Sequence, residues 1–157
     1  MPDQPIHSVS VAGIVVDEAG RVLVMQRRDN ARWEPPGGIL ERDETFEEGV
    51  VREVAEETGV LVAVDRLTGV YKNLSRAVVA LVYRCRPLGG ELRATDESAL
   101  VRWATLAEVD ALMTEAYAVR VRDALADAPA SRAHDGTDLV TEHTTRDNTG
   151  TRAGSPG

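Results

Sequence analysis

The stretch GILERDETFEEGVVREVAEETGV, residues 38–60, decides the fold of this chain. Thr45 and Glu48 stand three residues apart, as in a capping box, where each side chain accepts a hydrogen bond from the other residue's backbone N–H. Gly59 supplies the left-handed backbone that commonly ends a helix. We therefore predict a helix that begins after Thr45 and ends at Gly59.

This helix has an apolar arc and an acidic arc. At about 100° per residue, its valines share one side and Glu53, Glu56 and Glu57 share another. Neighbouring carboxylates repel one another, so the grouping asks for a cation, and hard oxygen ligands suit Mg²⁺ or Mn²⁺. A solvated acidic face is the simpler alternative. Gly49 lies on the acidic arc, where we expect its missing side chain to leave room for a metal-bound phosphate.

Upstream of the helix, two β-branched apolar runs at residues 8–16 and 21–27 are separated by turn-forming residues. These runs predict an antiparallel hairpin. The stretch EPPGG at residues 34–38 predicts a shaped loop, because two prolines remove N–H donors and two glycines allow backbone shapes closed to other residues.

Downstream of the helix we expect strands, a turn and two further helices, and then a tail. The expected elements are strands at 60–70 and 77–85, a turn at 87–90, a strand at 99–103, a helix at 105–112 that opens with a second capping box, and a helix at 115–126. From Pro129 onward the polar composition cannot offset its own ordering entropy. We therefore expect one domain at residues 1–128 and a flexible tail at 129–157.

The charge of the chain limits its partners. Its 157 residues include 26 acidic and 18 basic side chains, for a formal net charge of −8, which disfavours duplex nucleic acid and membrane surfaces. No apolar run approaches the roughly 20 residues that span a bilayer, and the first residues lack signal-peptide features. Cys85 is the single cysteine. We expect a cytoplasmic protein with Cys85 in a buried strand, and a homodimer is compatible with the sequence.

The acidic segment matches Gly-x5-Glu-x7-Arg-Glu-aliphatic-x-Glu-Glu-x-Gly-aliphatic at every position and resembles the Nudix box. At roughly 7% usage each, its seven fixed residues would coincide by chance on the order of once in 10⁸ start positions. The resemblance extends less sharply over residues 8–126. It implies an α+β chain folded as a Nudix-type α/β/α sandwich with a mixed β-sheet.

The resemblance also implies a metal site and a reaction. In the family, metal is coordinated by the carboxylates that correspond to Glu53, Glu56 and Glu57 and by a carbonyl of the glycine-rich loop, here Gly37 or Gly38, of which we expect Gly38. Water would attack a phosphoanhydride of a nucleoside diphosphate linked to another group, with Mg²⁺ or Mn²⁺ activating the water and neutralising charge. A small nucleotide is the implied partner.

Three supporting roles are open to more than one assignment. Related enzymes take the general base from the box or from a later loop, so Glu53 and Glu97 are the candidates, and Asp96 competes with Glu97. Glu44 is a ligand, an acceptor that supports a ligand, or a favourable charge at the helix start. The resemblance implies that Arg52 orients a glutamate or braces the loop.

Substrate contacts are expected from residues before the box. Arg27 and Arg28 end the second strand, where arginines of similar proteins meet phosphate, although surface solvation explains them nearly as well. Trp33 is a better candidate for stacking on a base than Trp103 and equally could cover the hairpin.

The substrate class is open, because residues that mark two subfamilies are absent at positions 75–77. We predict a (d)NTP pyrophosphohydrolase that forms a nucleoside monophosphate and pyrophosphate. An ADP-ribose or nucleotide-sugar pyrophosphatase is the alternative enzyme, and a non-catalytic nucleotide-sensing module is the alternative of another class. The net charge opposes an RNA-end-processing enzyme. His7, His134 and His143 show no ligand spacing and receive no role.

Overall fold

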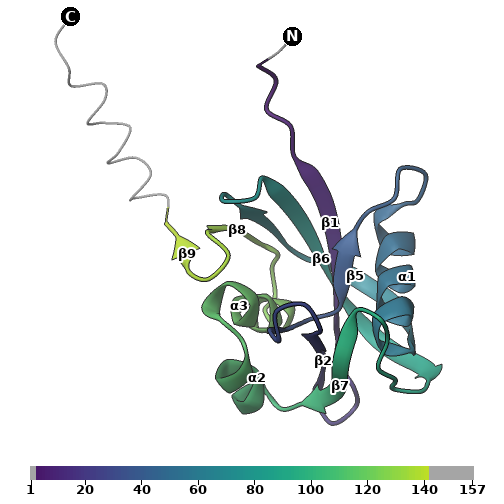
Figure 1. Cartoon of the computed structure of the whole chain (residues 1–157). Coiled ribbons are helices and arrows are strands. Elements are labelled where there is room, and N and C mark those ends of the chain that lie inside the picture. The colour runs from purple at the N-terminus through teal and green to yellow at the C-terminus, as the bar shows by residue number, and fades with distance from the viewer. Residues whose placement is uncertain (1–2, 142–157) are drawn as a thin grey trace, which may run out of the picture.

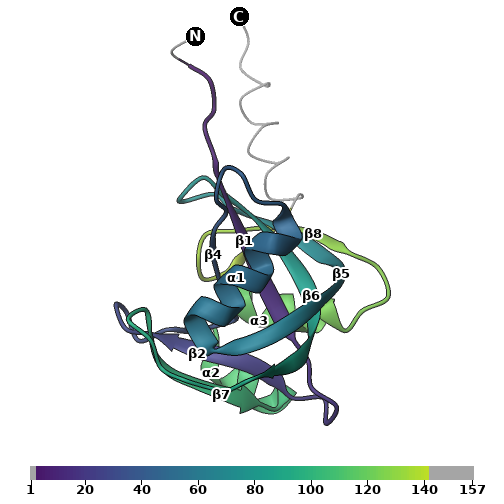
Figure 2. The ribbon, with the colours of Figure 1, turned by 90° about the vertical axis from the view of Figure 1, so that its right-hand side faces the viewer.

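The computed structural model describes residues 3–141. Helix α1 crosses one face of the larger sheet and α3 covers the other (Figures 1 and 2). The predicted α/β/α sandwich is therefore confirmed. None of the described helices is long and apolar enough to cross a membrane. The elements are β1 Ser8–Val15, β2 Val22–Arg27, β3 Trp33–Glu34, β4 Gly37–Ile39, α1 Phe46–Thr58, β5 Val60–Asn73, β6 Val78–Gly90, β7 Ser98–Ala104, α2 Leu106–Leu112, α3 Glu115–Ala124, β8 Ala130–His134 and β9 Leu139–Val140.

The strands form two sheets. The larger sheet has the order β4-β1-β6-β5-β8-β9, and the smaller has the order β3-β2-β7. The larger sheet is mixed, because β1 pairs with β6 and β5 with β8 in parallel, while its other pairs are antiparallel. β1 is buried on both faces: Val11 and Val15 join the core under α1, and Ala12 and Ile14 join the core under α2 and α3.

Helix α1 begins and ends where the sequence predicted. The Thr45 hydroxyl accepts the Glu48 N–H at 3.2 Å, and the Glu48 carboxylate accepts the Thr45 N–H at 2.9 Å. Gly59 follows the helix with a φ of 82°. The second capping box, at Thr105, is also formed and opens α2.

The predicted hairpin between the first two strands is wrong. The turn itself forms, since the Asp17 carboxylate accepts the Arg21 N–H at 2.8 Å and Gly20 takes a φ of 80°. Beyond the turn, the bridge between Val16 and Val22 is the only pairing between these strands in the described part of the chain. β1 pairs instead with β4 and β6, and β2 with β3 and β7, so the turn carries the chain from one sheet to the other.

The predicted turn at 87–90 is also wrong, because β6 continues to Gly90. Val60 pairs with Gly90 and Val62 with Pro87, with a register shift between them. Gly90 has a φ of 86°, and a Cβ there would lie 2.2 Å from the Gly59 carbonyl oxygen. Glycine at this position therefore allows the pairing of β5 with β6 to continue up to the end of α1.

Residues 130–140 differ from the flexible tail expected from Pro129 onward. β8 lies parallel to β5, and β9 extends the sheet by one more strand. The Arg132 guanidinium donates to both oxygens of Asp123 at 2.7 and 2.8 Å, and His134 is 1% exposed. The polar composition of this segment gives no sign of its partners, which come from α3 and β5. Residues 142–157, with His143, lie outside the described part of the chain.

These contacts make a truncation informative. A stop after residue 128 removes the Asp123–Arg132 ion pair and the buried His134, so we expect the melting temperature to fall by more than about 5 °C, as measured by circular dichroism. A stop after Thr141 keeps every described strand and is the control. Equal melting temperatures for the two truncated chains would show that β8 adds no stability.

Candidate active site

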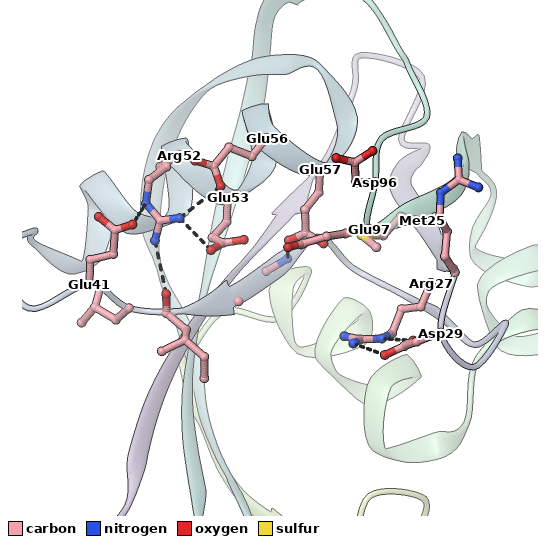
Figure 3. Close-up of a pocket in the computed structure, with 15 residues that line it drawn as sticks. Met25, Arg27, Asp29, Glu41, Arg52, Glu53, Glu56, Glu57, Asp96 and Glu97 are labelled. Atoms are coloured by element: carbon pink, nitrogen blue, oxygen red, sulfur yellow. Dashed lines mark hydrogen bonds and ion pairs between the residues drawn. The ribbon is translucent and has the colours of Figure 1, made fainter.

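A cavity of about 760 Å³ opens beside α1, and we call it the carboxylate cavity (Figure 3). Its walls come from the end of β2, from β4 and the loop after it, from α1 and from the loop before β7. Segments far apart in the sequence therefore meet in one place. The lining residues are Met25, Arg27, Arg28, Asp29, Gly37, Gly38, Ile39, Leu40, Glu41, Arg52, Glu53, Glu56, Glu57, Asp96 and Glu97.

Three carboxylates converge in this cavity. Glu53 and Glu57 project from α1 and are 7% and 3% exposed, whereas Glu97 comes from the exposed loop before β7. One oxygen from each of the three lies within 4.8 Å of the others. Glu56 lies at the rim, with a side chain 62% exposed and an oxygen 3.3 Å from Arg52. The structure thus brings Glu97, rather than Glu56, to Glu53 and Glu57.

The loop that carries Glu97 is tied directly to α1. The Ser98 hydroxyl donates to the Glu57 carbonyl oxygen at 2.6 Å and lies 3.0 Å from the Thr95 hydroxyl. The Arg28 guanidinium donates to the Thr95 carbonyl oxygen at 2.6 Å. These bonds fix the loop beside Glu57. The sequence analysis missed the positioning role of Ser98, for which the Thr95-x-x-Ser98 spacing of a polar turn is the only local signal.

Arg52 connects the helix to the loop before it. Its guanidinium donates to the two Glu44 oxygens at 2.9 and 2.6 Å. It also donates to Glu53 at 2.8 Å and to the Ile39 carbonyl oxygen at 3.2 Å (Figure 3). Arg52 thus contacts both a box glutamate and the loop. Glu44 is fully engaged, since it also accepts the Glu41 N–H at 2.9 Å, and the bonds from Arg52 lower the pKa of Glu44 to about 2. Of the three assignments open for Glu44, this geometry favours support.

The buried carboxylates are compatible with a bound cation. Burial raises the pKa of Glu57, the nearby Glu53 and Glu97 carboxylates raise it further, and the Gly37 N–H, donated at 3.0 Å, opposes this rise. Arg52 contacts Glu53, but no ion pair within residues 3–141 involves Glu57 or Glu97. A hard divalent cation fits this set, because carboxylate oxygens are its preferred ligands and its charge would offset the repulsion.

Two glycines lie close to the carboxylates or to the helix that carries them. A Cβ at Gly38 would lie 2.6 Å from an oxygen of Glu53, so glycine leaves space for that carboxylate. Gly49 does not face the cavity. A Cβ there would lie 2.7 Å from Leu40 and 3.1 Å from Val11, so the expectation that Gly49 makes room for a phosphate is wrong, and this glycine allows α1 to pack closely.

The expected substrate contacts have protein partners. Arg27 lines the cavity but pairs with Asp29 at 2.7 Å and with Glu34 at 3.1 Å. Arg28 lines it too and holds the Thr95 carbonyl oxygen. Trp33 is not among the lining residues, and its half-buried ring packs against the core under α3.

Comparisons with known proteins identify relatives of this chain. Residues 6–125 match the NUDIX domain. A "MutT-like protein" of Streptomyces ambofaciens is 58% identical over 137 residues, which cover 87% of this chain and 89% of the relative. An "ADP-ribose pyrophosphatase" of Methanocaldococcus jannaschii is 38% identical over 58% of this chain and 57% of its own length. A "putative 8-oxo-dGTP diphosphatase 2" of Mycobacterium tuberculosis is 39% identical over 66% of this chain and 77% of its own length.

Solved structures share the fold. A NUDIX hydrolase from Nitrosomonas europaea superposes with a TM-score of 0.70 at 24% identity, covering 81% of this chain and 77% of the other. A MutT NUDIX hydrolase from Burkholderia pseudomallei gives a TM-score of 0.68 at 25% identity, covering 75% and 98%.

Because the pKa of Glu57 is raised, we predict that the stability of the metal-free protein depends on pH. Between the unfolded pKa of about 4.3 and the higher folded pKa, the folded state binds more protons than the unfolded state, so the stability of the wild type falls as pH rises. Glu57→Gln removes this titration. In EDTA, we expect its melting temperature to exceed that of the wild type by several degrees at about pH 8 and to approach it at about pH 5.

Added Mg²⁺ or Mn²⁺ should then raise the wild-type melting temperature more than that of Glu57→Gln, because the cation binds the charged form. Glu18→Gln is the control, since it makes the same charge change at an exposed turn. Parallel pH curves for Glu57→Gln and the wild type would contradict the raised pKa.

Proposed function

We propose that this chain, which belongs to the Nudix family and is a Nudix hydrolase, cleaves (d)NTPs to a nucleoside monophosphate and pyrophosphate. The observation that carries the chemistry is the convergence of Glu53, Glu57 and Glu97 in one cavity. The substrate class is supported by the relative named as a putative 8-oxo-dGTP diphosphatase, which is 39% identical to this chain.

The metal would be held by Glu53 and Glu57, with the Gly38 carbonyl beside them and Glu56 at the rim. When bound, Mg²⁺ or Mn²⁺ lowers the pKa of the attacking water and neutralises phosphate charge. Arg52 positions Glu53 through its bond at 2.8 Å and anchors the loop at Ile39. The role of the protein is thus mainly to position carboxylates around a charged substrate.

Glu97 is the general base in this proposal. One Glu53 oxygen is engaged by the Arg52 guanidinium at 2.8 Å, whereas Glu97 is exposed to the solvent from which the attacking water enters. The water oxygen forms a bond to a phosphorus of the anhydride, and the bond from that phosphorus to the bridging oxygen breaks. The proton from the water passes to the Glu97 carboxylate, and pyrophosphate leaves.

An ADP-ribose pyrophosphatase is the second candidate, favoured by the relative of that name at 38% identity. The same cluster would serve both reactions, since both cleave a phosphoanhydride. The difference lies in what the rest of the cavity accepts.

Product analysis separates these candidates. Purified protein with Mg²⁺ is incubated with dGTP, oxidised dGTP, ADP-ribose and a nucleotide sugar, and products are resolved by ion-exchange chromatography. We expect a nucleoside monophosphate and pyrophosphate from the triphosphates. Turnover of ADP-ribose alone would replace the first substrate class with the second. Absence of turnover with Mg²⁺ and with Mn²⁺, while nucleotides still raise the melting temperature, would indicate a binding module.

The assignment of the base is tested by adjacent residues. Glu97→Gln should lower kcat by about 100-fold or more and leave KM nearly unchanged, because it removes a proton acceptor and keeps the loop contacts. Asp96→Asn makes the same charge change one residue earlier and should retain kcat within about threefold. A large loss in Asp96→Asn with activity kept in Glu97→Gln would transfer the role to Asp96.

A further inference from the structure

A second cavity of about 310 Å³ adjoins the first, and we call it the Arg120 cavity. The two cavities share Arg27 and the three residues of β4, so a substrate bound at the carboxylates can extend past Gly37 and Gly38 into the second one. The sequence analysis assigned no role to the residues at its far end, Tyr117, Arg120 and His134.

Arg120 is buried and has no carboxylate partner. It projects from α3 and is 7% exposed. One Nη lies 3.3 Å from the His134 ring nitrogen, and Nε has no hydrogen-bond partner. Among the ion pairs formed by residues 3–141, none includes Arg120, although α3 carries another arginine, Arg122, that pairs with Asp110 at 2.8 Å.

Burying a guanidinium without a carboxylate partner costs free energy. Removing a cation from water is compensated only when acceptors replace the solvent, and an unsatisfied buried donor adds to the cost. Two aromatic rings offset part of it: the guanidinium carbon lies 4.9 Å from the Tyr71 ring centre and 4.7 Å from that of Tyr117. The rings contact the guanidinium without accepting hydrogen bonds from it in the plane of the fork, so the N–H donors that His134 does not engage are left for a ligand.

We propose that Arg120 is a specificity-determining residue that binds the base of the substrate through paired acceptors on one edge, as the O6 and N7 atoms of guanine provide. A planar arginine fork matches such an edge and rejects adenine, whose corresponding position carries an amino donor. The inference deepens the proposed function and rests on it, because it takes the nucleotide to be the ligand of the carboxylate cavity.

The cavity wall suits a nucleotide base. Glu34 and Arg27 both line the cavity and pair with each other at 3.1 Å, so Glu34 does not leave an unpaired charge there. Ala12 and Ala80, on the neighbouring strands β1 and β6, line the cavity with small apolar side chains. Together with the Tyr117 ring they give the cavity an apolar surface, which suits a planar ring with a few polar contacts.

The test measures binding without hydrolysis. Isothermal titration calorimetry compares dGMP with dAMP, neither of which contains a phosphoanhydride, for the wild type, Arg120→Lys and Arg120→Met. The wild type should bind dGMP at least about tenfold more tightly, in line with one paired contact. Both variants should lose most of this preference, since lysine keeps the charge without the fork and methionine removes both.

Two controls separate a ligand role from a structural one. Arg122→Lys changes an exposed arginine on the same helix and should keep the preference for dGMP. Arg120→Met should melt no lower than the wild type, because it removes an unpaired buried charge; a large fall would assign Arg120 to holding the tyrosines together.

Other outcomes also decide the matter. Equal binding of dGMP and dAMP by the wild type would overturn the proposal, and so would a preference for dGMP that survives in Arg120→Lys. An equal loss of affinity for both nucleotides in the variants would also overturn it and would assign Arg120 to the phosphate. A preference for dGMP in a protein that hydrolyses no triphosphate would instead overturn the proposed function and leave the base contact standing.

Discussion

The close approach of α1 to β1 and β4 is the constraint on which the rest of the structure depends. A Cβ at Gly13 would lie 3.0 Å from Val54, and one at Gly49 would lie 3.1 Å from Val11, so the helix can lie this near the sheet only where side chains are missing. This distance brings Glu57 to the Gly37 N–H and Glu53 beside Gly38. The packing of the core therefore sets the positions of the carboxylates.

The same packing creates an electrostatic problem that the site uses. Two glutamates are buried on one side of α1 in a chain of net charge −8, and Arg52 neutralises one of them. The remaining repulsion would favour a bound cation, and that cation would let an acidic protein hold a polyphosphate. The proposed site would thus lower the stability of the metal-free protein and raise its affinity for the cation.

Features with local signals were predicted correctly from the sequence. The caps at Thr45 and Gly59 depend on residues within one turn of the helix, and the spacing of the acidic residues identified both the family and the cavity. Features that depend on distant partners were not predictable in this way. The turn at Asp17 does not reveal that its strands enter different sheets, and the composition after Pro129 does not reveal Asp123 as a partner. The role proposed for Arg120 likewise depends on its contacts with aromatic rings of α3 and β5, which the sequence does not show.

The bond from the Ser98 hydroxyl to the Glu57 carbonyl has a consequence for how the enzyme loses activity. Ser98 begins a strand of the smaller sheet, while α1 packs on the larger one, so the three carboxylates lie where the two sheets meet. A local movement of the loop before Ser98 would separate Glu97 from Glu53 and Glu57 while the helices and strands persisted. Heating would then inactivate the protein below the temperature of global unfolding, and cooling would restore activity, because neither sheet has to form again.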